Sequence, residues 1–499
     1  MERYRNYYPR DDPPLADDDG GFRGVNMRLD PGQLPAGTAA EGRNVRFVNG
    51  VAMPRLGLHK PTWANNVTGS ALTKFVGVLG AGVFTAPDGL EWLIVVDLRA
   101  CWKLRPALGP SQVRMPTGFA PVGPVQFVQC LNALIMFQGT DTAPLEMTDL
   151  DEGFKSIAKR DTSETLELDS EGGDPIVMDD YDTDLGTVIP NSDSGCFFQN
   201  RLLIPYDFDL VAVSDYLNYT RYAPVRNAFR INQGQQDKLV ALYKFSASAV
   251  LCLKSHSVHI VYNLTGDLST AVLDEITREY GCRSPRTVCA VGADVWWLSE
   301  GGVMGVKQTT EGKVQGISLP LSEAIQPLIN RINWKFADNA RAAYWENRYY
   351  LAVPLDAAGP VPVVTRATNL LYTITGLIPG RTYAYKPGTV DTWLDYGTVP
   401  EPMRLIGTGE FVAQADSAHV DIASPGLPAW NGQIQVVDGV NTAILVYDFL
   451  NQAWSGYDDA EGFYPQEFVQ MKLKGRNRLM CLDAFGFINV LEDGAQDQV

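Results

Sequence analysis

The chain repeats one short pattern, in which a turn or break is followed by a run of apolar residues. Seven such runs begin near residues 92, 133, 202, 249, 295, 349 and 479. Three of the intervals are about 41, 47 and 46 residues, and the two longest contain insertions. Short apolar runs bounded by turn residues are typical of strands buried on both faces. A repeat of this length is typical of a four-stranded propeller blade.

Turn chemistry supports the repeat. Asparagine precedes four of the runs, at Asn132, Asn200, Asn347 and Asn477. Three runs continue through a tight break into a second apolar strand, which is the pattern of a hairpin: Ser299–Gly302 before Val303–Val306, Lys254–His256 before Val258–Tyr262, and Asp483–Gly486 before Phe487–Leu491. We therefore predict an all-β fold with a β-propeller-like core of six to eight blades. Stacked β-sandwiches are the alternative, but they have no reason to keep a period near 45.

Composition agrees with this prediction. The 499 residues are 45% hydrophobic and include 46 Gly and 31 Pro. Such a chain can bury a large core while its many chain breakers separate short strands. A propeller also accommodates this length in one disc, because each blade adds its own layer.

Residues 149–194 form a first insertion. They contain 14 acidic side chains against Lys155, Lys159 and Arg160, a net charge of −11. We expect a solvated, self-repelling loop. Within it, Asp179–Asp184 has the oxygen ligands that calcium prefers, but it lacks the Gly and the closing Glu of an EF-hand. No metal ion is assigned to it.

Residues 356–435 form a second insertion. Alternating strands in Tyr372–Tyr385 surround a corner built from Leu377, Pro379, Gly380 and Tyr383. This corner resembles the E–F region of a fibronectin type III sandwich. The resemblance implies a small fibronectin III/Ig-like β-sandwich grafted between two strands of one blade, at a loop tip where insertions are tolerated.

The expected organisation is an extended arm over residues 1–21, the first part of the propeller-like core over 22–355, the sandwich, and the final part of the core over 436–499. Little of the chain has a helical pattern. Leu321–Ile332 has helical spacing with Ser322 as an N-cap, and Pro327 confines it to a short piece.

Charge and cysteine usage limit the function. The formal net charge is −17, whereas a chain that grips DNA or RNA normally presents a basic face. Residues 1–20 lack the apolar region of a secretory signal, and no run of about 18 apolar residues predicts a membrane span. Seven cysteines without a C-x-x-C pair are expected to be buried thiols in a reducing, cytosol-like compartment.

The sequence offers little for catalysis. The four histidines are His59, His256, His259 and His419. His256 and His259 are three apart in a strand pattern, so we expect them on opposite faces and not as a chelating pair. Asn191–Phe198 resembles a degraded sialidase Asp-box, with Asn191 and Phe198 in place of Ser/Thr and Trp. We assign no catalytic, cofactor-binding or metal-binding residue and expect no enzymatic activity.

A family resemblance lies near the N-terminus. The chain has F-x-G-x-N from Phe22 to Asn26, then L-x-P at Leu29–Pro31, then Gly42-x-N-x-x-F, and R-x-G at Arg55–Gly57. This series resembles the N-terminal signature of tailed-bacteriophage tail proteins, except that Gly42 stands where that signature has Ala. Further blocks of the same type are Gln199–Leu202, Val213–Thr220, Glu279–Cys282 and Asp294–Val303.

Together these blocks resemble the tail nozzle, or tubular tail protein, of short-tailed phages, over most of the chain except the two insertions. The resemblance implies a virion protein, assembled in the host cytoplasm as a ring of typically six copies below the portal and its adaptor. DNA would pass through the ring's channel at ejection without specific binding, and the outer surface would support tail fibres. The charge of −17 per copy fits a channel that repels its cargo.

The alternative is a carbohydrate-binding or glycan-cleaving β-propeller at the phage or cell surface, since propellers often carry glycosidase sites. The two hypotheses differ in what they predict for the sandwich, which would carry glycan binding only in the second. The Tyr- and Pro-rich arm Met1–Leu15 can order against a neighbouring subunit in the first hypothesis, or remain a disordered terminus.

Overall fold

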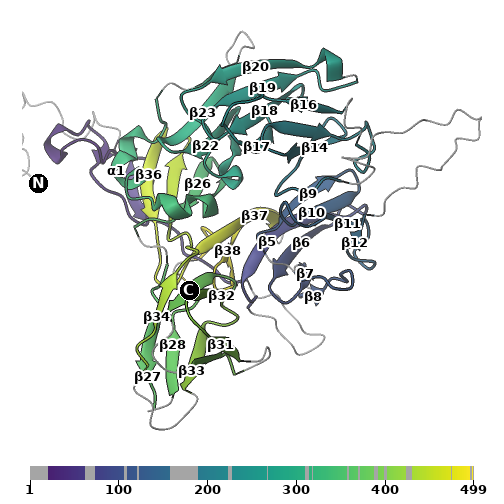
Figure 1. Ribbon diagram of the computed structural model, residues 1–499. Helices are drawn as coiled ribbons and strands as arrows, with labels where there is room; N and C mark the ends of the chain where they lie inside the picture. Colours follow the sequence, from purple (N-terminus) through teal and green to yellow (C-terminus); the bar gives the residue numbers. More distant parts are fainter. Residues whose placement is uncertain are drawn as a thin grey trace, which may run out of the picture.

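The computed structural model describes residues 21–61, 74–105, 109–120, 123–157, 189–222, 227–266, 268–308, 314–316, 319–356, 359–368, 371–386, 392–397, 402–422, 430–473, 475–494 and 497. Within these ranges, seven antiparallel sheets are arranged as the blades of a propeller, and a β-sandwich projects from one face of it (Figure 1). The all-β, propeller-like fold with an inserted sandwich is therefore confirmed. Seven blades fall within the predicted six to eight.

The blades follow each other along the chain. Blade 1 contains β5 (Val78–Thr85), β6 (Glu91–Asp97), β7 (Cys101–Leu104) and β8 (Ser111–Gln112). Blade 2 contains β9 (Gln126–Cys130), β10 (Ala133–Phe137), β11 (Leu145–Met147) and β12 (Lys155–Ser156). Blade 3 contains β13 (Cys196–Phe198), β14 (Arg201–Tyr206), β15 (Leu210–Val213) and β16 (Ala228–Arg230). Blade 4 contains β17 (Leu239–Lys244), β18 (Ala249–Lys254), β19 (Val258–Tyr262) and β20 (Val272–Thr277).

Blade 5 keeps this simple order, whereas blades 6 and 7 depart from it. Blade 5 contains β21 (Cys289–Val291), β22 (Asp294–Ser299), β23 (Gly302–Gln308) and the short β24 (Val314–Gly316). Blade 6 contains β25 (Arg341–Trp345), β26 (Arg348–Val353), β35 (Ala443–Asp448) and β36 (Ala453–Asp458), with the sandwich between its second and third strands. Blade 7 contains β37 (Pro465–Leu473), β38 (Arg476–Asp483) and β39 (Ile488–Val490).

The seven apolar runs seen in the sequence are the second strands of the seven blades. These strands are almost fully buried because both of their faces pack against neighbouring blades. Two of the preceding asparagines sit in turns with two positive φ angles, Gln199–Asn200 (47° and 61°) and Glu346–Asn347 (45° and 61°). That geometry defines the type I′ hairpin turn, which favours Asn. Asn477 differs, since it lies inside β38 and not in the turn.

Each pair of adjacent blades shares one apolar core. The contacts run around the whole ring, and one pair of residues represents each core: Phe84 with Met136, Phe137 with Leu202, Val213 with Cys252, Leu251 with Trp297, Trp296 with Tyr349, Tyr350 with Leu479, and Met480 with Leu93. The last pair joins blade 7 to blade 1, and β37 lies beside β5, so the ring is closed.

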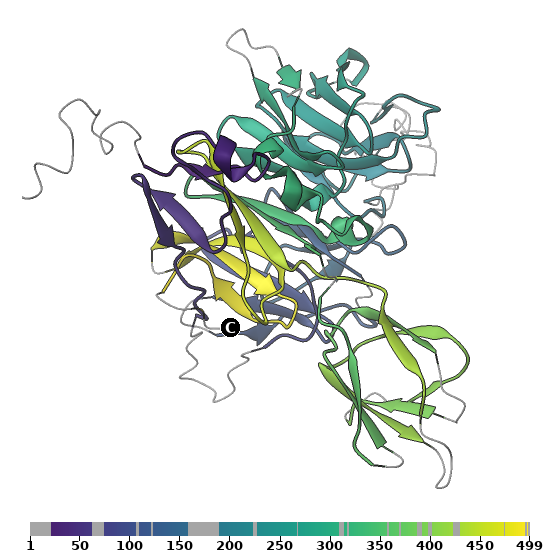
Figure 2. The same cartoon turned by 90° about the vertical axis from the view of Figure 1, so that its left-hand side faces the viewer.

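The N-terminal segment completes blade 7. His59 and Val490 exchange two backbone hydrogen bonds of 3.0 and 2.7 Å, which adds an extended segment outside β39. Before this point the segment forms β1 (Gly24–Val25), which is paired in parallel with β2 (Thr38–Ala39), and a hairpin of β3 (Val45–Val48) and β4 (Val51–Pro54). Both lie along β36 of blade 6 (Figure 2).

The sandwich has two sheets. One has the order β27 (Val363–Arg366), β28 (Leu371–Thr375), β33 (Ser417–Ile422), β30 (Thr392–Asp395) and β31 (Met403–Leu405). The other has β32 (Gly409–Val412), β29 (Thr382–Lys386) and β34 (Gln433–Val436). The Tyr383 hydroxyl accepts a hydrogen bond of 2.9 Å from the Ile378 amide, which is a tyrosine corner. The last strand ends at Val436, one residue past the predicted boundary of 435.

Helical structure is sparse in the described ranges. The 3₁₀ turns are η1 (Pro31–Gln33), η2 (Leu268–Thr270), η3 (Pro285–Thr287), η4 (Glu323–Ile325) and η5 (Trp334–Asn339), and α1 covers only Gln326–Ile329. The short helix expected near Pro327 is thus present. The expected N-cap is wrong: the Ser322 hydroxyl makes no cap bond and instead accepts the Val303 amide at 3.0 Å. None of the helices in these ranges is long and apolar enough to span a membrane.

The first insertion is narrower than predicted. Lys155–Ser156 is β12, the outer strand of blade 2, and Ile189 is buried in the core between blades 2 and 3, so both ends of 149–194 belong to the propeller. The candidate calcium segment Asp179–Asp184 lies outside the described residues, as does the arm Met1–Leu15.

Candidate functional site

The segment that resembles the phage signature lies on the outside of blades 6 and 7. Its glycines allow it to approach the blade closely. A Cβ on Gly42 would lie 2.2 Å from the Ser455 carbonyl oxygen, and one on Gly456 (φ 97°) would lie 2.0 Å from the Gly42 oxygen. The departure from Ala at position 42 therefore has a physical reason, because no side chain fits between the segment and β36.

A buried ion cluster fixes this segment in place. Arg46, 4% exposed, donates from Nε to Glu492 Oε1 (2.6 Å) and from Nη1 to Asp458 Oδ1 (2.9 Å). Asp458 ends β36 and Glu492 follows β39, so one guanidinium joins blade 6 to blade 7. Burial alone would lower the pKa of Arg46, but the two carboxylates raise it above its ordinary value. Arg55 extends the cluster to Asp497 at 2.8 Å.

A second cluster lies where the sandwich meets the propeller axis. Arg286 donates to Glu467 (3.0 Å), and Arg341 donates to the same carboxylate (3.3 Å). From the sandwich, Arg381 pairs with Asp438 at 3.1 Å and with Gln466 beside Glu467. Burial, then the charge of Arg286, lowers the pKa of Arg341 to about 9. The three arginines therefore hold more positive charge than the two carboxylates balance.

Two hollows meet at this cluster. One of about 720 Å³ lies on the propeller axis and is lined by first strands of several blades. Another of about 250 Å³ lies between the propeller face and the sandwich. Both are lined by Arg286 and Glu467. The sandwich is thus attached at one end of the axial hollow.

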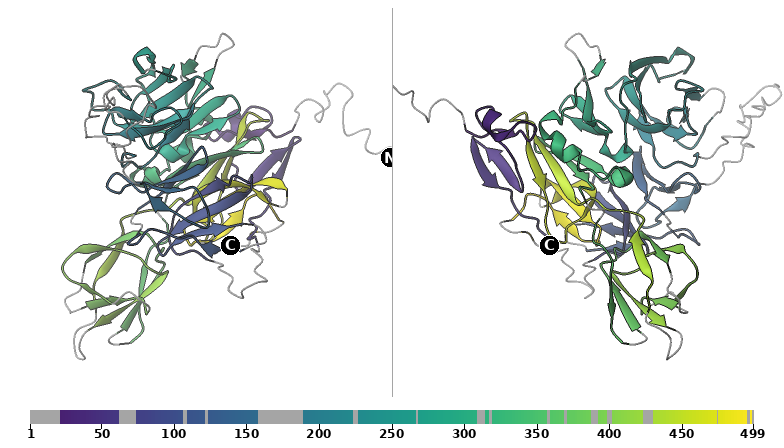
Figure 3. Two further views of the ribbon diagram at one scale, coloured as in Figure 1. Left: turned by 90° about the vertical axis from the view of Figure 1, so that its right-hand side faces the viewer. Right: turned by 60° about the vertical axis from the view of Figure 1, so that its left-hand side comes forward.

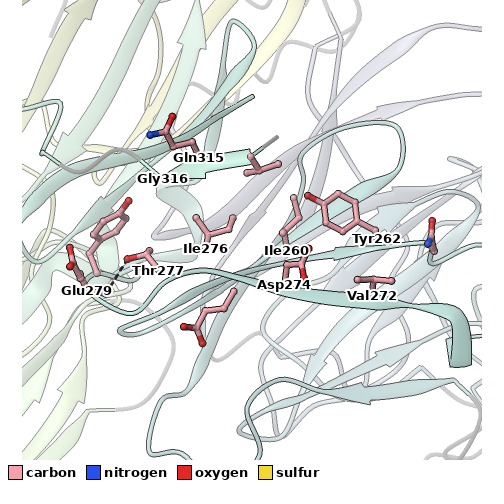
Figure 4. Close-up of a pocket in the computed structure, with 13 residues that line it drawn as sticks. Ile260, Tyr262, Val272, Asp274, Ile276, Thr277, Glu279, Gln315 and Gly316 are labelled. Carbon is pink, nitrogen blue, oxygen red and sulfur yellow. Dashed lines mark hydrogen bonds between the residues drawn. The ribbon is translucent and has the colours of Figure 1, made fainter. Parts of the chain in front are cut away.

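An open hollow of about 980 Å³ lies between the outer strands of blades 4 and 5 (Figure 4). It lies where the three residues of β24 face the six residues of β20. Among the described residues its lining combines apolar and acidic side chains: Ile260, Tyr262, Val272, Asp274, Glu275, Ile276, Glu279 and Tyr280, with Val314–Gly316 opposite. Arg278, between two of these residues in the chain, is paired with Glu275. We call this feature the blade 4/5 hollow.

The two candidate histidines are not both in a strand. His259 is in β19 and 1% exposed, whereas His256 lies in the preceding turn and is exposed. Both histidines lie near Asp237. Its carboxylate accepts hydrogen bonds from the Ser257 hydroxyl (2.5 Å) and from the His256 amide (2.8 Å). Ser257 also lies 3.0 Å from His259 Nε2. Burial lowers the pKa of His259. Its imidazole is therefore neutral at pH 7 and packs between blades 3 and 4.

The other candidate residues have structural surroundings. His59 completes blade 7, and His419 lies in β33 of the sandwich near Thr373. Asn191–Phe198, the segment like an Asp-box, leads into β13, with Phe198 buried between blades 3 and 4. In the part of the chain that the structure describes, no three His, Cys, Asp or Glu residues are grouped as metal ligands.

All seven cysteines are free, and five are buried, as the sequence predicted. Burial raises the pKa of Cys196, Cys282 and Cys289 to about 12. These thiols are therefore protonated at neutral pH and are poor nucleophiles.

Sequence reasoning missed both arginine clusters. Arg46 lies within the signature segment, but a buried arginine has the same local pattern as an exposed one. Arg286, Arg341 and Arg381 are far apart in the chain and meet only because three different blades and the sandwich converge on one axis. No spacing rule would have joined them.

Comparison with protein-family models and with curated proteins found no match. Among solved structures, the extracellular domain of the putative one component system BT4673 from B. thetaiotaomicron is 9% identical, covers 85% of this chain and 60% of its own, and has a TM-score of 0.31. BamB from Moraxella catarrhalis is 8% identical, covers 87% and 96%, and has a TM-score of 0.32. PorZ from Porphyromonas gingivalis is 11% identical, covers 85% and 52%, and also scores 0.32. The chain thus spans about 60% of the length of the first of these proteins.

Proposed function

We propose that this chain is a structural subunit of the tail of a short-tailed bacteriophage. Several copies would form a ring below the portal and its adaptor, and DNA would cross the ring's channel at ejection. The observation that carries the proposal is the position of the signature segment. It lies on the perimeter of the propeller, locked to two blades by Arg46, and leaves β4 with all four residues exposed.

A perimeter strand of this kind suits assembly. Val51 is 56% exposed and Met53 is 41% exposed, in a strand that is paired on one side by β3. Natural proteins usually protect the edges of their sheets from other chains. An apolar edge that no described strand covers, on a segment that Arg46 fixes to two blades, favours a role in subunit contact.

The charge supports passage of DNA without retention. Each copy has a net charge of −17, and a ring multiplies that charge around its channel. A surface that made phosphate contacts would hold DNA with steeply salt-dependent affinity. An acidic wall repels the duplex and leaves it free to move.

The sandwich suits an attachment role. It extends away from the propeller (Figures 1 and 2) and is anchored by Arg381 and by apolar packing of Ile378 and Val440 on Ala484. Such a domain presents its outer sheets to other proteins without disturbing the ring. We propose that it supports fibres or another tail component.

Electron microscopy of the purified full-length chain at high concentration tests the proposal. The expected result is a ring of several copies, typically six. The same sample should not retain a duplex DNA fragment in a filter-binding assay at low salt. A strictly monomeric particle, or tight DNA binding that weakens steeply with salt, would contradict the proposal.

A glycan array tests the alternative function. If the chain is a carbohydrate-binding propeller, it should bind glycans, and a variant lacking residues 356–441 should lose that binding if the sandwich carries it. We expect no glycan binding by either protein. The structure supports this design because the sandwich has its own core and is inserted between two neighbouring strands of blade 6.

A further inference from the structure

Two surfaces of this chain expose apolar strand edges, and they lie on different sides of the propeller. One is the hairpin edge, formed by β4 together with Phe22, Leu56 and Leu450. The other is the outer edge of β20 with the adjoining blade 4/5 hollow. Figure 3 shows the N-terminal hairpin (purple) well separated from the teal strands of blade 4. We propose that β4 of one copy adds to β20 of the next copy in the ring, an inference that rests on the proposed function.

The hairpin edge exposes apolar side chains to solvent, which is energetically unfavourable. Both faces of β4 are in solvent, and its neighbours Leu56 and Leu450 are 55% and 74% exposed. Leu450 belongs to the same surface, since the adjacent Asn451 side chain donates to the Phe47 carbonyl of β3 at 2.7 Å. Contiguous exposed apolar groups of this kind mark interaction sites in soluble proteins.

The edge of β20 has complementary properties. It is the last strand of its sheet, and its first four residues are exposed, including Val272 (45%) and Leu273 (38%). Its free backbone groups can pair with an incoming strand. The blade 4/5 hollow beside it offers space for apolar side chains such as Met53 and Leu56, against Ile260, Val272 and Ile276.

Charge also favours this pairing. The described lining of the hollow contains Asp274, Glu275 and Glu279; Glu275 is paired with Arg278, whereas Asp274 and Glu279 have no ion-pair partner among the described residues. Residues 21–60 contain six basic and two acidic residues, a net of +4 in a chain of −17. Arg23 has no ion-pair partner among the described residues, and the paired Arg28 and Arg43 remain largely exposed. An exposed pair of this kind is weak and can exchange its partner.

The same charges disfavour a two-fold contact. Antiparallel pairing of β20 with its own copy, centred on the strand, would place Asp274 opposite Glu275 of the other copy, and like charges opposite each other destabilise a sheet. Pairing two different surfaces is a heterologous contact, which generates a closed ring or an open filament and not a dimer. The surfaces of this chain therefore suit the ring that the proposed function requires.

Mixed disulfide trapping tests the contact. Met53→Cys and Leu273→Cys are made as separate full-length proteins, mixed under assembly conditions and oxidised mildly. We expect a covalent dimer in the mixture and none from either variant alone. Native thiols are poor competitors, because five are buried and the pKa values of Cys196 and Cys289 are about 12. Val361→Cys, on the exposed sandwich, replaces Met53→Cys as the control and should give no product.

A charge variant provides the second arm. Met53→Asp places a carboxylate against the acidic hollow, so the concentration needed for assembly should rise roughly tenfold or more. Its melting temperature should not change, because Met53 is exposed. Val361→Asp is the matched control and should assemble normally.

The outcomes distinguish a failure of the β4–β20 contact from a failure of the proposed tail-ring function. If rings form but the mixture gives no disulfide and Met53→Asp assembles like the wild type, the β4–β20 contact is wrong while the tail-ring function stands. If the wild-type chain never forms a ring, the proposed function fails and the contact fails with it. Rings together with the specific disulfide support both.

Discussion

The propeller and the sandwich are stabilised in different ways, although both are antiparallel β-structures. In the propeller, every apolar core is shared by two blades, so the stability of each sheet depends on its neighbours. The sandwich has one core of its own between its two sheets, built around Ile374, Tyr383 and Val420. A local defect should therefore affect the propeller as a whole but remain within the sandwich.

The largest effect is expected at the buried arginine that joins blades 6 and 7. Arg46→Ala removes the cation that bonds both Asp458 and Glu492 and leaves Asp458 with only the longer 3.9 Å contact to Arg55, which should lower the free energy of unfolding of the propeller by about 3–5 kcal/mol. Calorimetry should show the propeller transition shifted down and the sandwich transition unchanged. Lys386→Ala, an exposed change in the sandwich, is the control and should stay within about 0.5 kcal/mol. Equal shifts of both transitions would show that the two regions unfold as one unit.

A pH dependence should follow from Asp483 in blade 7. Burial raises the pKa of this carboxyl to about 6, above its value in the unfolded chain. The folded state therefore binds the extra proton, and stability falls as the pH rises from about 4 to about 6. Relative to Asp483→Asn, the wild-type propeller should be about 2 kcal/mol more stable at pH 4.5 than at pH 7.

Denaturant unfolding of both proteins at the two pH values measures this difference. The comparison cancels the titration of every other group. A constant difference between wild type and variant across this range would contradict the raised pKa of Asp483.

The tyrosine corner provides the matching defect in the sandwich. Tyr383→Phe removes the acceptor of the buried Ile378 amide, which should cost about 1–2 kcal/mol. Only the sandwich transition should move. Tyr385→Phe is the matched control in the same strand, because the described residues offer its hydroxyl no hydrogen bond; it should have little effect. A shift of the propeller transition would mean that the junction at Arg381 couples the two regions.

The smallest effect is expected at a turn of blade 3. Leu217 has a φ of 59°, a left-handed conformation that is strained for leucine. Its side chain is 55% exposed, so burial does not compensate for this strain. Leu217→Asn should stabilise the propeller by about 0.5–1 kcal/mol, since Asn tolerates this conformation better. A thermal melt is sufficient to detect the change. A loss of stability would show that the leucine side chain makes a contribution that its exposure does not reveal.

The repetitive part of the fold could be predicted from the sequence because its signal is local. A second strand that is buried on both faces produces a continuous apolar run, as in Ala249–Leu253. A type I′ turn favours asparagine, which is found at Asn200 and Asn347. The tyrosine corner is equally local, since Tyr383 bonds to a residue five positions earlier. Such features need no knowledge of distant parts of the chain.

What could not be predicted depends on distant segments. The segment that completes blade 7 pairs with β39 through an isolated bridge at His59, which is too short for any strand pattern. The blade 4/5 hollow depends on how β20 and β24 of neighbouring blades face each other, which no local pattern in Val314–Gly316 indicates. Serine is a favoured residue at an N-cap, but the Ser322 hydroxyl instead accepts a hydrogen bond from the Val303 amide.

The closure of blade 7 by the N-terminus also sets an order of events during synthesis. His59 is made early, but its partner Val490 follows 431 residues later, which is roughly 20–90 s at ordinary translation rates. Until then the core around Leu58 lacks Leu491, and Arg46 lacks its partner Glu492. A chain that stops short of residue 490 can pack blade 7 against blade 1 but cannot pair the N-terminal segment with β39. The perimeter segment is therefore held on blade 7 only after the last strand of that blade has been made.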